Sequence, residues 1–173
     1  MKSRSLLLVV ATSLLSAIAT AQTTSRAPTQ APPPGNIQLL PGFVHERRQG
    51  IDSRVGVIYK EGGLSIGYDI GRMAGVYASQ YFPEHFEQIK KQTNLNADAI
   101  EREIKFLQDK IEWRQRQEIN GDEVLIVHLK DSTLIASFVN STANFTAKVH
   151  SGDEIADFLL TVLTYQPNLG KKE

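Results

Sequence analysis

The stretch Gly50–Gly71 constrains the fold most, because two runs of alternating apolar residues lie on either side of Gly62-Gly63. Paired glycines between such runs are typical of a two-residue β-hairpin turn. Folding about this turn predicts one apolar face made of three facing pairs: Val55 with Ile70, Val57 with Tyr68, and Tyr59 with Ile66. The other face would hold three small or polar pairs: Gly56 with Asp69, Ile58 with Gly67, and Lys60 with Ser65. Because a two-stranded ribbon is marginal alone, the apolar face needs a partner, and its burial is expected to fix the register.

A short polar strand is predicted before this hairpin and two helices after it. Phe43–Gln49 alternates in the manner of an edge strand, where charge blocks further pairing. Pro83 suits the first turn of one helix, and Asn96 can cap a second. The second helix has an apolar stripe at helical spacing, made of Ile100, Ile104, Leu107 and Ile111.

From Trp113 onward the apolar period changes to two, which predicts further strands. Val124–Leu129 and Thr133–Val139 are apolar on both faces, so we expect central strands that are covered on both sides. A tight turn at Asp131-Ser132 predicts three facing pairs: Leu125 with Phe138, Val127 with Ala136, and Leu129 with Leu134. Phe145–Val149 is the last strand, and the capping-box pattern Ser151–Glu154 opens a final helix.

This order of elements predicts the α+β class, with segregated strands and helices. We expect an antiparallel sheet of about six to seven strands, made of an N-terminal hairpin and a C-terminal meander, with two or three helices packed on it. The late strands and closing helix, Trp113 to Tyr165, resemble the Mog1/PsbP-like fold. The resemblance concerns the fold alone and implies no activity and no site residue.

Residues 1–21 have the parts of a secretory signal peptide. Lys2 and Arg4 supply a positive start, Leu6–Ala19 is largely apolar, and Ala19-Thr20-Ala21 offers small residues for cleavage. The alternative is an N-terminal membrane anchor, which would need about 20 apolar residues. The apolar stretch here is shorter than that. We therefore expect an exported protein, periplasmic or extracellular, with no stable membrane span after signal cleavage.

The remaining chain divides into a linker, one domain and a short tail. Residues 22–37 contain four of the seven prolines and a single charged residue, Arg26, so we expect a Pro/Thr/Gln-rich linker. Pro32–Pro34 could alternatively be a proline-rich ligand for a partner. Residues 38–167 are expected to form a single α+β domain, and 168–173 a tail.

Composition excludes several chemistries. Basic and acidic residues number 19 each, and the balance without Lys2 and Arg4 is 17 to 19, so no basic excess points to nucleic acid. The absence of cysteine excludes disulfides and thiolate chemistry. Four histidines lie far apart without metal-ligand spacing: His45, His85, His128 and His150. We expect no metal and no cofactor.

The densest polar group lies around the hairpin. Its candidate ligand-binding residues are Arg47, Arg48, Asp52, Arg54, Asp69 and Arg72. Arginine can hold a carboxylate or phosphate through two parallel hydrogen bonds. The alternative is a set of solvated edge charges. Ser53 lacks the GxSxG context of a nucleophile, so Asp52-Ser53 is interpreted as a turn.

Two hypotheses of function follow from these features. The first is a non-enzymatic, exported binding or envelope-associated module whose partner is a small molecule, a peptide or an envelope protein. The alternative is a small exported hydrolase whose site is assembled by folding around Asp52 and Asp69 with a histidine. A histidine within hydrogen-bond reach of either carboxylate would favour the enzyme. Asn140 and Asn144 also begin glycosylation patterns, which matter only where that machinery exists.

Overall fold

The structure is a computed structural model that describes residues 32–91 and 96–167, and one seven-stranded antiparallel sheet lies at its centre. The strands are β1 (Phe43–Arg48), β2 (Arg54–Lys60), β3 (Ser65–Ile70), β4 (Ile111–Ile119), β5 (Asp122–Leu129), β6 (Thr133–Phe138) and β7 (Ala143–Lys148). The helices are α1 (Pro83–Lys90), α2 (Ala97–Asp109) and α3 (Gly152–Val162), with short 3₁₀ turns η1 (Pro34–Asn36) and η2 (Tyr77–Tyr81). The α+β class is confirmed.

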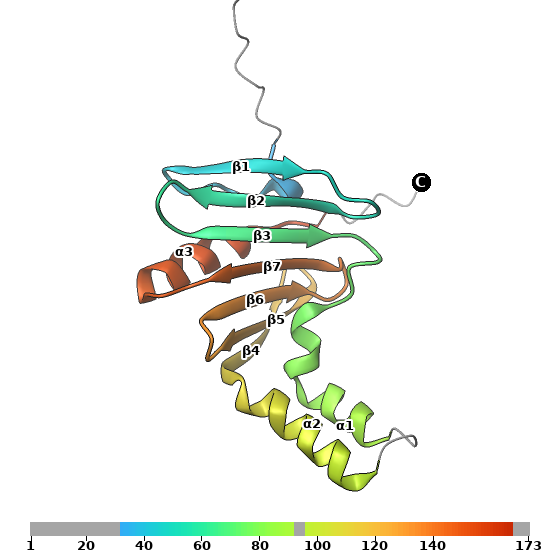
Figure 1. Ribbon diagram of the computed structural model, residues 1–173. Helices are drawn as coiled ribbons and strands as arrows, with labels where there is room; N and C mark the ends of the chain where they lie inside the picture. Colours follow the sequence, from blue (N-terminus) through green and yellow to red (C-terminus); the bar gives the residue numbers. More distant parts are fainter. Residues whose placement is uncertain (1–31, 92–95, 168–173) are drawn as a thin grey trace, which may run out of the picture.

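Two meanders make up the sheet, and the pairing of β3 with β7 joins them. The strand order is β1-β2-β3-β7-β6-β5-β4, so β1 and β4 are the edges (Figure 1). After β3 the chain leaves the middle of the sheet, passes through η2, α1 and α2, and re-enters at the far edge as β4. The predicted N-terminal hairpin is thus part of a three-stranded meander, and the polar strand that precedes it is an edge strand as predicted.

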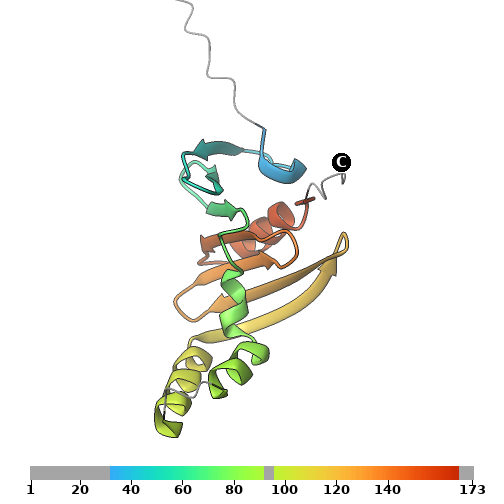
Figure 2. The same ribbon diagram turned by 90° about the vertical axis from the view of Figure 1, so that its right-hand side faces the viewer.

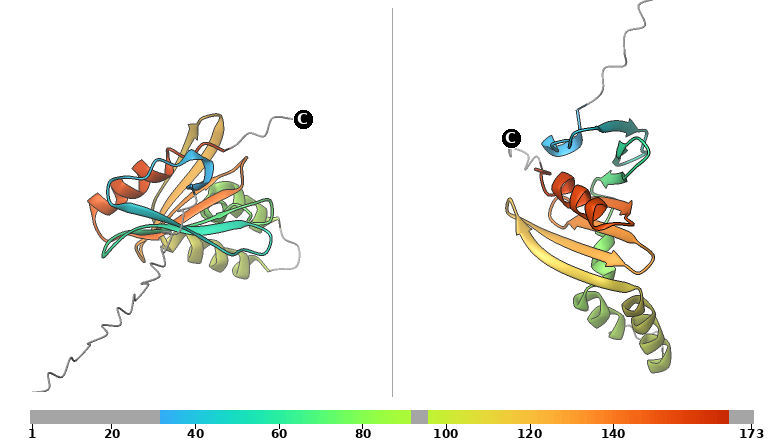
Figure 3. Two further views of the ribbon diagram at one scale, coloured as in Figure 1. Left: turned by 90° about the horizontal axis from the view of Figure 1, so that it is seen from above. Right: turned by 90° about the vertical axis from the view of Figure 1, so that its left-hand side faces the viewer.

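Helices cover the two faces of the sheet unequally. α3 lies on one face, here the α3 face, and η2, α1 and α2 lie on the other, the α1 face (Figures 2 and 3). Val124 and Ile126 of β5 pack into the α3-face core, whereas Leu125 and Val127 pack into the α1-face core. The prediction that β5 and β6 are covered on both sides is therefore confirmed.

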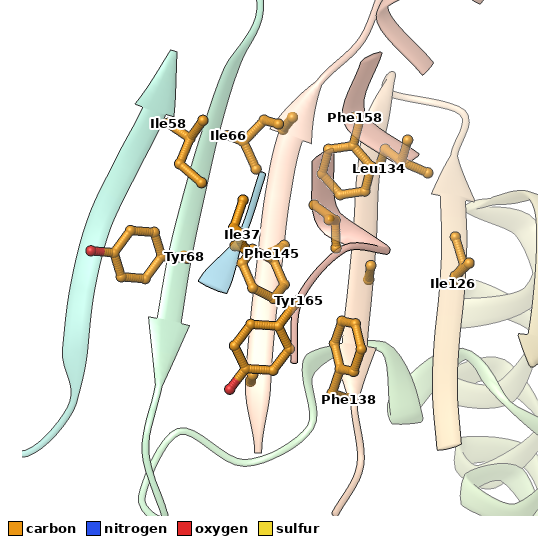
Figure 4. Packing of buried hydrophobic residues seen from close by; sticks show 14 of the residues in the cluster. Ile37, Ile58, Ile66, Tyr68, Ile126, Leu134, Phe138, Phe145, Phe158 and Tyr165 are labelled. Carbon is orange, nitrogen blue, oxygen red and sulfur yellow. The ribbon is translucent and has the colours of Figure 1, made fainter. Parts of the chain in front are cut away.

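Aromatic rings fill the centre of the α3-face core (Figure 4). Tyr165 meets Phe138 and Phe145 edge to face, with ring centroids 4.9 and 5.3 Å apart. Such pairs contribute about 0.5–1.5 kcal/mol each beyond their buried area. Tyr165 also presses on Gly35, where an added Cβ would lie 2.2 Å from the ring. At the end of the expected linker, Ile37 belongs to this core, and Pro34 is buried as well.

The predicted register of β2 against β3 is wrong by one residue. The structure pairs Ile58 with Ile66, Gly56 with Tyr68, and Arg54 with Ile70. The cause is the loop, because Lys60 N donates to Leu64 O at 2.9 Å, so that these two residues face each other and close a loop of three residues, Glu61–Gly63. The β3 side chains face the core as predicted, but fully buried Ile58 joins them there, and Val55, Val57 and Tyr59 turn to the other face.

The same error occurs in the β5–β6 hairpin. A two-residue turn at Asp131-Ser132 was expected, but β5 ends at Leu129 and β6 begins at Thr133, which again leaves a three-residue loop. Ser132 has φ of +67° and its N–H donates to Leu129 O at 2.9 Å. The observed pairs are accordingly Val124 with Phe138, Ile126 with Ala136, and His128 with Leu134.

The starts of α2 and α3 follow the predicted capping residues, whereas α2 ends at Asp109 and Ile111, predicted on its apolar stripe, begins β4. Asn96 Oδ1 accepts a hydrogen bond from Ala99 N at 2.8 Å at the start of α2, and Ser151 Oγ accepts one from Glu154 N at 3.2 Å at the start of α3. Glu154 Oε2 in turn accepts from His150 N at 2.6 Å, one residue before the usual partner of a capping box. In the described part of the chain, no helix has the length and apolar character needed to cross a membrane.

The observed register explains why residue 56 is glycine, because the Tyr68 ring crosses β2 directly above it. Figure 4 shows the Tyr68 hydroxyl directed away from Phe145 toward β2. The hydroxyl lies 2.8 Å from His45 Nε2 on β1, and His45 is only 4% exposed. A Cβ added at Gly56 would lie 2.3 Å from the Tyr68 Oη and 2.5 Å from Glu46 O. Only glycine leaves room for this crossing.

We therefore expect Gly56→Ala to destabilise the protein by about 1–3 kcal/mol, the usual cost of an overpacked site. Gly67→Ala on β3 is the matched control, because its Cβ would meet Thr146 Oγ1 at 3.5 Å, an ordinary contact. The control should be neutral or stabilising by about 0.5–1 kcal/mol, since alanine loses less backbone entropy than glycine on folding. Urea unfolding measures both. A Gly56→Ala protein as stable as Gly67→Ala would contradict the observed register.

Candidate functional site

Loops from three parts of the chain meet at one end of the sheet, the right-hand end in Figure 1. Gly71 N donates to Thr142 O at 3.2 Å, and a Cβ added at Gly71 would lie 3.0 Å from Ser53 Cβ. Between these loops lies an open hollow of about 690 Å³, here called the arginine hollow. Its wall includes Arg47, Asp52, Arg54, Arg72, Ser141 and Tyr165.

Four of the six predicted ligand-binding residues line the arginine hollow: Arg47, Asp52, Arg54 and Arg72. Arg48 lies beside it, in an adjoining depression that shares Arg47 and Arg54, and its Nε is 3.7 Å from Glu46 Oε1. Asp69 does not line either space. The structure thus gathers the arginines of the predicted group and separates Asp69 from them.

Strand register explains why Arg47 and Arg54 lie on the same face of the sheet. Arg47 on β1 pairs with Gly56, and Arg54 on β2 pairs with Ile70, so both lie on the face that carries Tyr68. Arg72 follows β3 in the loop that contacts residues 52 and 53 through Gly71. Two of the three arginines are therefore held by strands, which restricts where their side chains can reach.

The arginine hollow is a cationic environment. Within residues 32–91 and 96–167, no carboxylate forms an ion pair with Arg47, Arg54 or Arg72. Asp52 is the one acidic residue in the described lining. Burial raises the pKa of Tyr68, while the nearby guanidinium groups of Arg47 and Arg54 act in the opposite direction. Unpaired, solvent-exposed guanidinium groups in one concave space can bind a carboxylate or a phosphate.

Asp69 belongs to a second polar group on the α1 face. The Tyr77 hydroxyl donates to Asp69 Oδ2 at 2.5 Å, and this hydrogen bond raises the pKa of Tyr77 to about 12. The other oxygen, Asp69 Oδ1, is buried with no hydrogen-bond partner in the described part of the chain. Alternation along β3 explains the separation, because Tyr68 and Asp69 point to opposite faces.

Two buried polar residues complete this second group, and the sequence analysis did not single them out for it. Asn144 Oδ1 accepts from Tyr77 N at 2.9 Å and from Ser137 Oγ at 2.7 Å, and Asn144 Nδ2 donates to Gly75 O at 3.0 Å. These hydrogen bonds hold the segment after β3 against the sheet. The available signal was a serine and an asparagine that each lie between two apolar residues of a strand. Asn144 is 1% exposed, so its glycosylation pattern is inaccessible in the folded protein, whereas Asn140 is exposed.

The histidines do not join the predicted carboxylates. His45 contacts Tyr68, and the ring of His128 lies 5.6 Å from that of Trp113. Among the described residues, no hydrogen bond connects a histidine side chain with Asp52 or Asp69. No cluster of three or more potential metal ligands occurs in that part of the chain either.

No protein-family model, curated protein or solved structure matches the chain. The resemblance of Trp113–Tyr165 to the Mog1/PsbP-like fold therefore stays a prediction.

The hydrogen bond between Tyr77 and Asp69 predicts a measurable titration. The phenol should ionise near pH 12 instead of 10, and Asp69→Asn should return its pKa toward 10 because the charged acceptor is gone. Since the folded-state pKa is raised, the stability from this contact is present below pH 10 and falls as the pH rises toward 12. Ultraviolet difference titration measures it, with Tyr77→Phe to identify the signal. An unchanged titration in Asp69→Asn would contradict the assignment.

Proposed function

We propose that the protein is an exported, non-enzymatic binding module whose arginine hollow takes an anionic ligand. The ligand would be a carboxylate or phosphate carried by a small molecule, a peptide or an envelope component. The observation that carries the proposal is the arrangement of Arg47, Arg54 and Arg72, three arginines without a carboxylate partner in the described chain, around one open hollow.

The energetics favour binding at this site. A hydrogen bond to a charged group contributes about 1.5–3 kcal/mol, and a bidentate arginine contact makes two. The hollow is open and its arginines are exposed, so solvent screening reduces each contribution. Several guanidinium groups acting on one ligand offset this loss. We therefore expect moderate affinity that weakens as the salt concentration rises.

The hydrolase alternative has less support. Asp52 lines the arginine hollow, whereas Asp69 lies on the α1 face and accepts from Tyr77. A site built on both carboxylates would need them on the same side of the sheet. Binding without chemistry needs only the arginines and the strands that hold them.

Export remains part of the proposal and is supported by the signal-like segment Met1–Ala21. An exported module with a cationic hollow would meet anionic components of the envelope or its surroundings. The overall charge balance, 19 basic to 19 acidic residues, supports a local site over a general affinity for polyanions.

Inorganic phosphate and succinate serve as probes of the site. We expect each to raise the melting temperature of the protein saturably, because a ligand that binds the folded state stabilises it. Arg54→Gln should weaken the binding of both by about tenfold, which corresponds to about 1.4 kcal/mol. Arg102→Gln on α2 is the matched control, since Arg102 is exposed and does not line the hollow. No saturable shift, or equal losses in the two variants, would contradict the proposal.

A further inference from the structure

Two strongly exposed apolar side chains belong to the loops that form the arginine hollow. Ile51, in the loop between β1 and β2, is 105% exposed, and Met73, in the loop after β3, is 75% exposed. They are the two most exposed of the large apolar residues in the described chain. Single exposed apolar residues are common on protein surfaces. Here, however, both lie in loops at the end of the sheet that carries the hollow: Ile51 lines it, and Met73 follows Arg72, which also lines it.

The two loops are in direct contact, which brings residues 51 and 73 to the same end of the sheet. Gly71 lies against Ser53, and Ile51 and Met73 are each two residues away from this contact. A Cβ at Gly71 would lie 3.0 Å from the Ser53 side chain, so the loops cannot separate without losing that packing. Both exposed side chains therefore belong to loops that pack against each other.

The charges around these projections are mostly positive. Arg47, Arg54 and Arg72 line the hollow between the loops, and Arg48 adjoins it. Asp52 is the acidic residue among them, whereas Asp69 lies on the opposite face and accepts a hydrogen bond from Tyr77. Apolar side chains surrounded by arginines match the interface of an anionic bilayer, where acyl chains lie beneath phosphate groups.

We propose that this end of the sheet docks on an anionic phospholipid bilayer, with Ile51 and Met73 in the interfacial layer and the arginines on lipid phosphates. The proposal rests on the proposed function, because the same arginines bind the anion. A small free anion would leave Ile51 and Met73 in water and give them no role. A planar bilayer accepts both apolar projections and several phosphates at once.

Vesicle sedimentation tests the proposal with purified protein at low salt. We expect binding to vesicles of phosphatidylcholine with phosphatidylglycerol, and little binding to vesicles of phosphatidylcholine alone. The double variant Ile51→Ser/Met73→Ser should reduce partitioning into the vesicles by about tenfold. The double variant Arg54→Gln/Arg72→Gln should reduce it by about the same factor. Leu160→Ser is the matched control, because Leu160 is 59% exposed on α3 and does not line the hollow. Binding that survives in the Ile51/Met73 variant, or that falls equally in the control, would overturn the proposal.

A fluorescent label locates the contact, because the chain has no cysteine and a single introduced thiol can be labelled selectively. An environment-sensitive dye on Ile51→Cys should brighten and shift to the blue with anionic vesicles, whereas the same dye on Leu160→Cys should not. No change at Ile51→Cys would overturn the docking geometry. Wild-type protein that binds inorganic phosphate but not vesicles would overturn this inference and leave the proposed function standing. Wild-type protein that binds neither phosphate nor vesicles would overturn this inference and the proposed function together. Capture of a protein partner or a second copy without vesicle binding would overturn the bilayer as the occupant of this surface.

Discussion

The pairing of β2 with β3 determines which side chains can meet at the end of the sheet. The loop Glu61–Gly63 sets this pairing, because Lys60 and Leu64 close it with a backbone hydrogen bond of 2.9 Å. Gly56 consequently lies opposite Tyr68, and the phenol crosses β2 to reach His45. The same register turns Arg54 toward the α3 face. A register shifted by one residue would turn Arg54 away from Tyr68 and remove it from the hollow.

The pairing of β3 with β7 then adds the second meander, whose loops complete the site. It brings Gly71 beside Thr142, so loops from both meanders form one wall. Tyr165, packed on Phe138 and Phe145, brings itself and Pro167 to the same place, where both line the hollow. The arginines are thus held on a surface whose base belongs to the main core. Their shared position, not the overall charge of the chain, is what supports binding of an anion.

Much of the fold could be predicted from the sequence, because apolar periodicity and capping residues act locally. The strands, the helix starts at Pro83 and Asn96, and the α+β class follow from such patterns. Both hairpin registers were wrong for one reason: each loop holds three residues where two were assumed. The arginines that line the hollow could be grouped because they are near in sequence. The hydrogen bond of Asn144 with Tyr77 could not, since it depends on β3 pairing with a strand about 80 residues away.

Cross-strand disulfides measure the register of β2 and β3 directly in this cysteine-free chain. The structure pairs Tyr59 with Ser65, and facing residues of antiparallel strands lie about 4.5–5.5 Å apart between Cα atoms, within disulfide range. Lys60 and Ser65 would face each other only in the shifted register. Under mild oxidation, Tyr59→Cys/Ser65→Cys should lose its free thiols as a monomer, and Lys60→Cys/Ser65→Cys should keep both. The opposite result would contradict the register and the placement of Arg54 in the hollow.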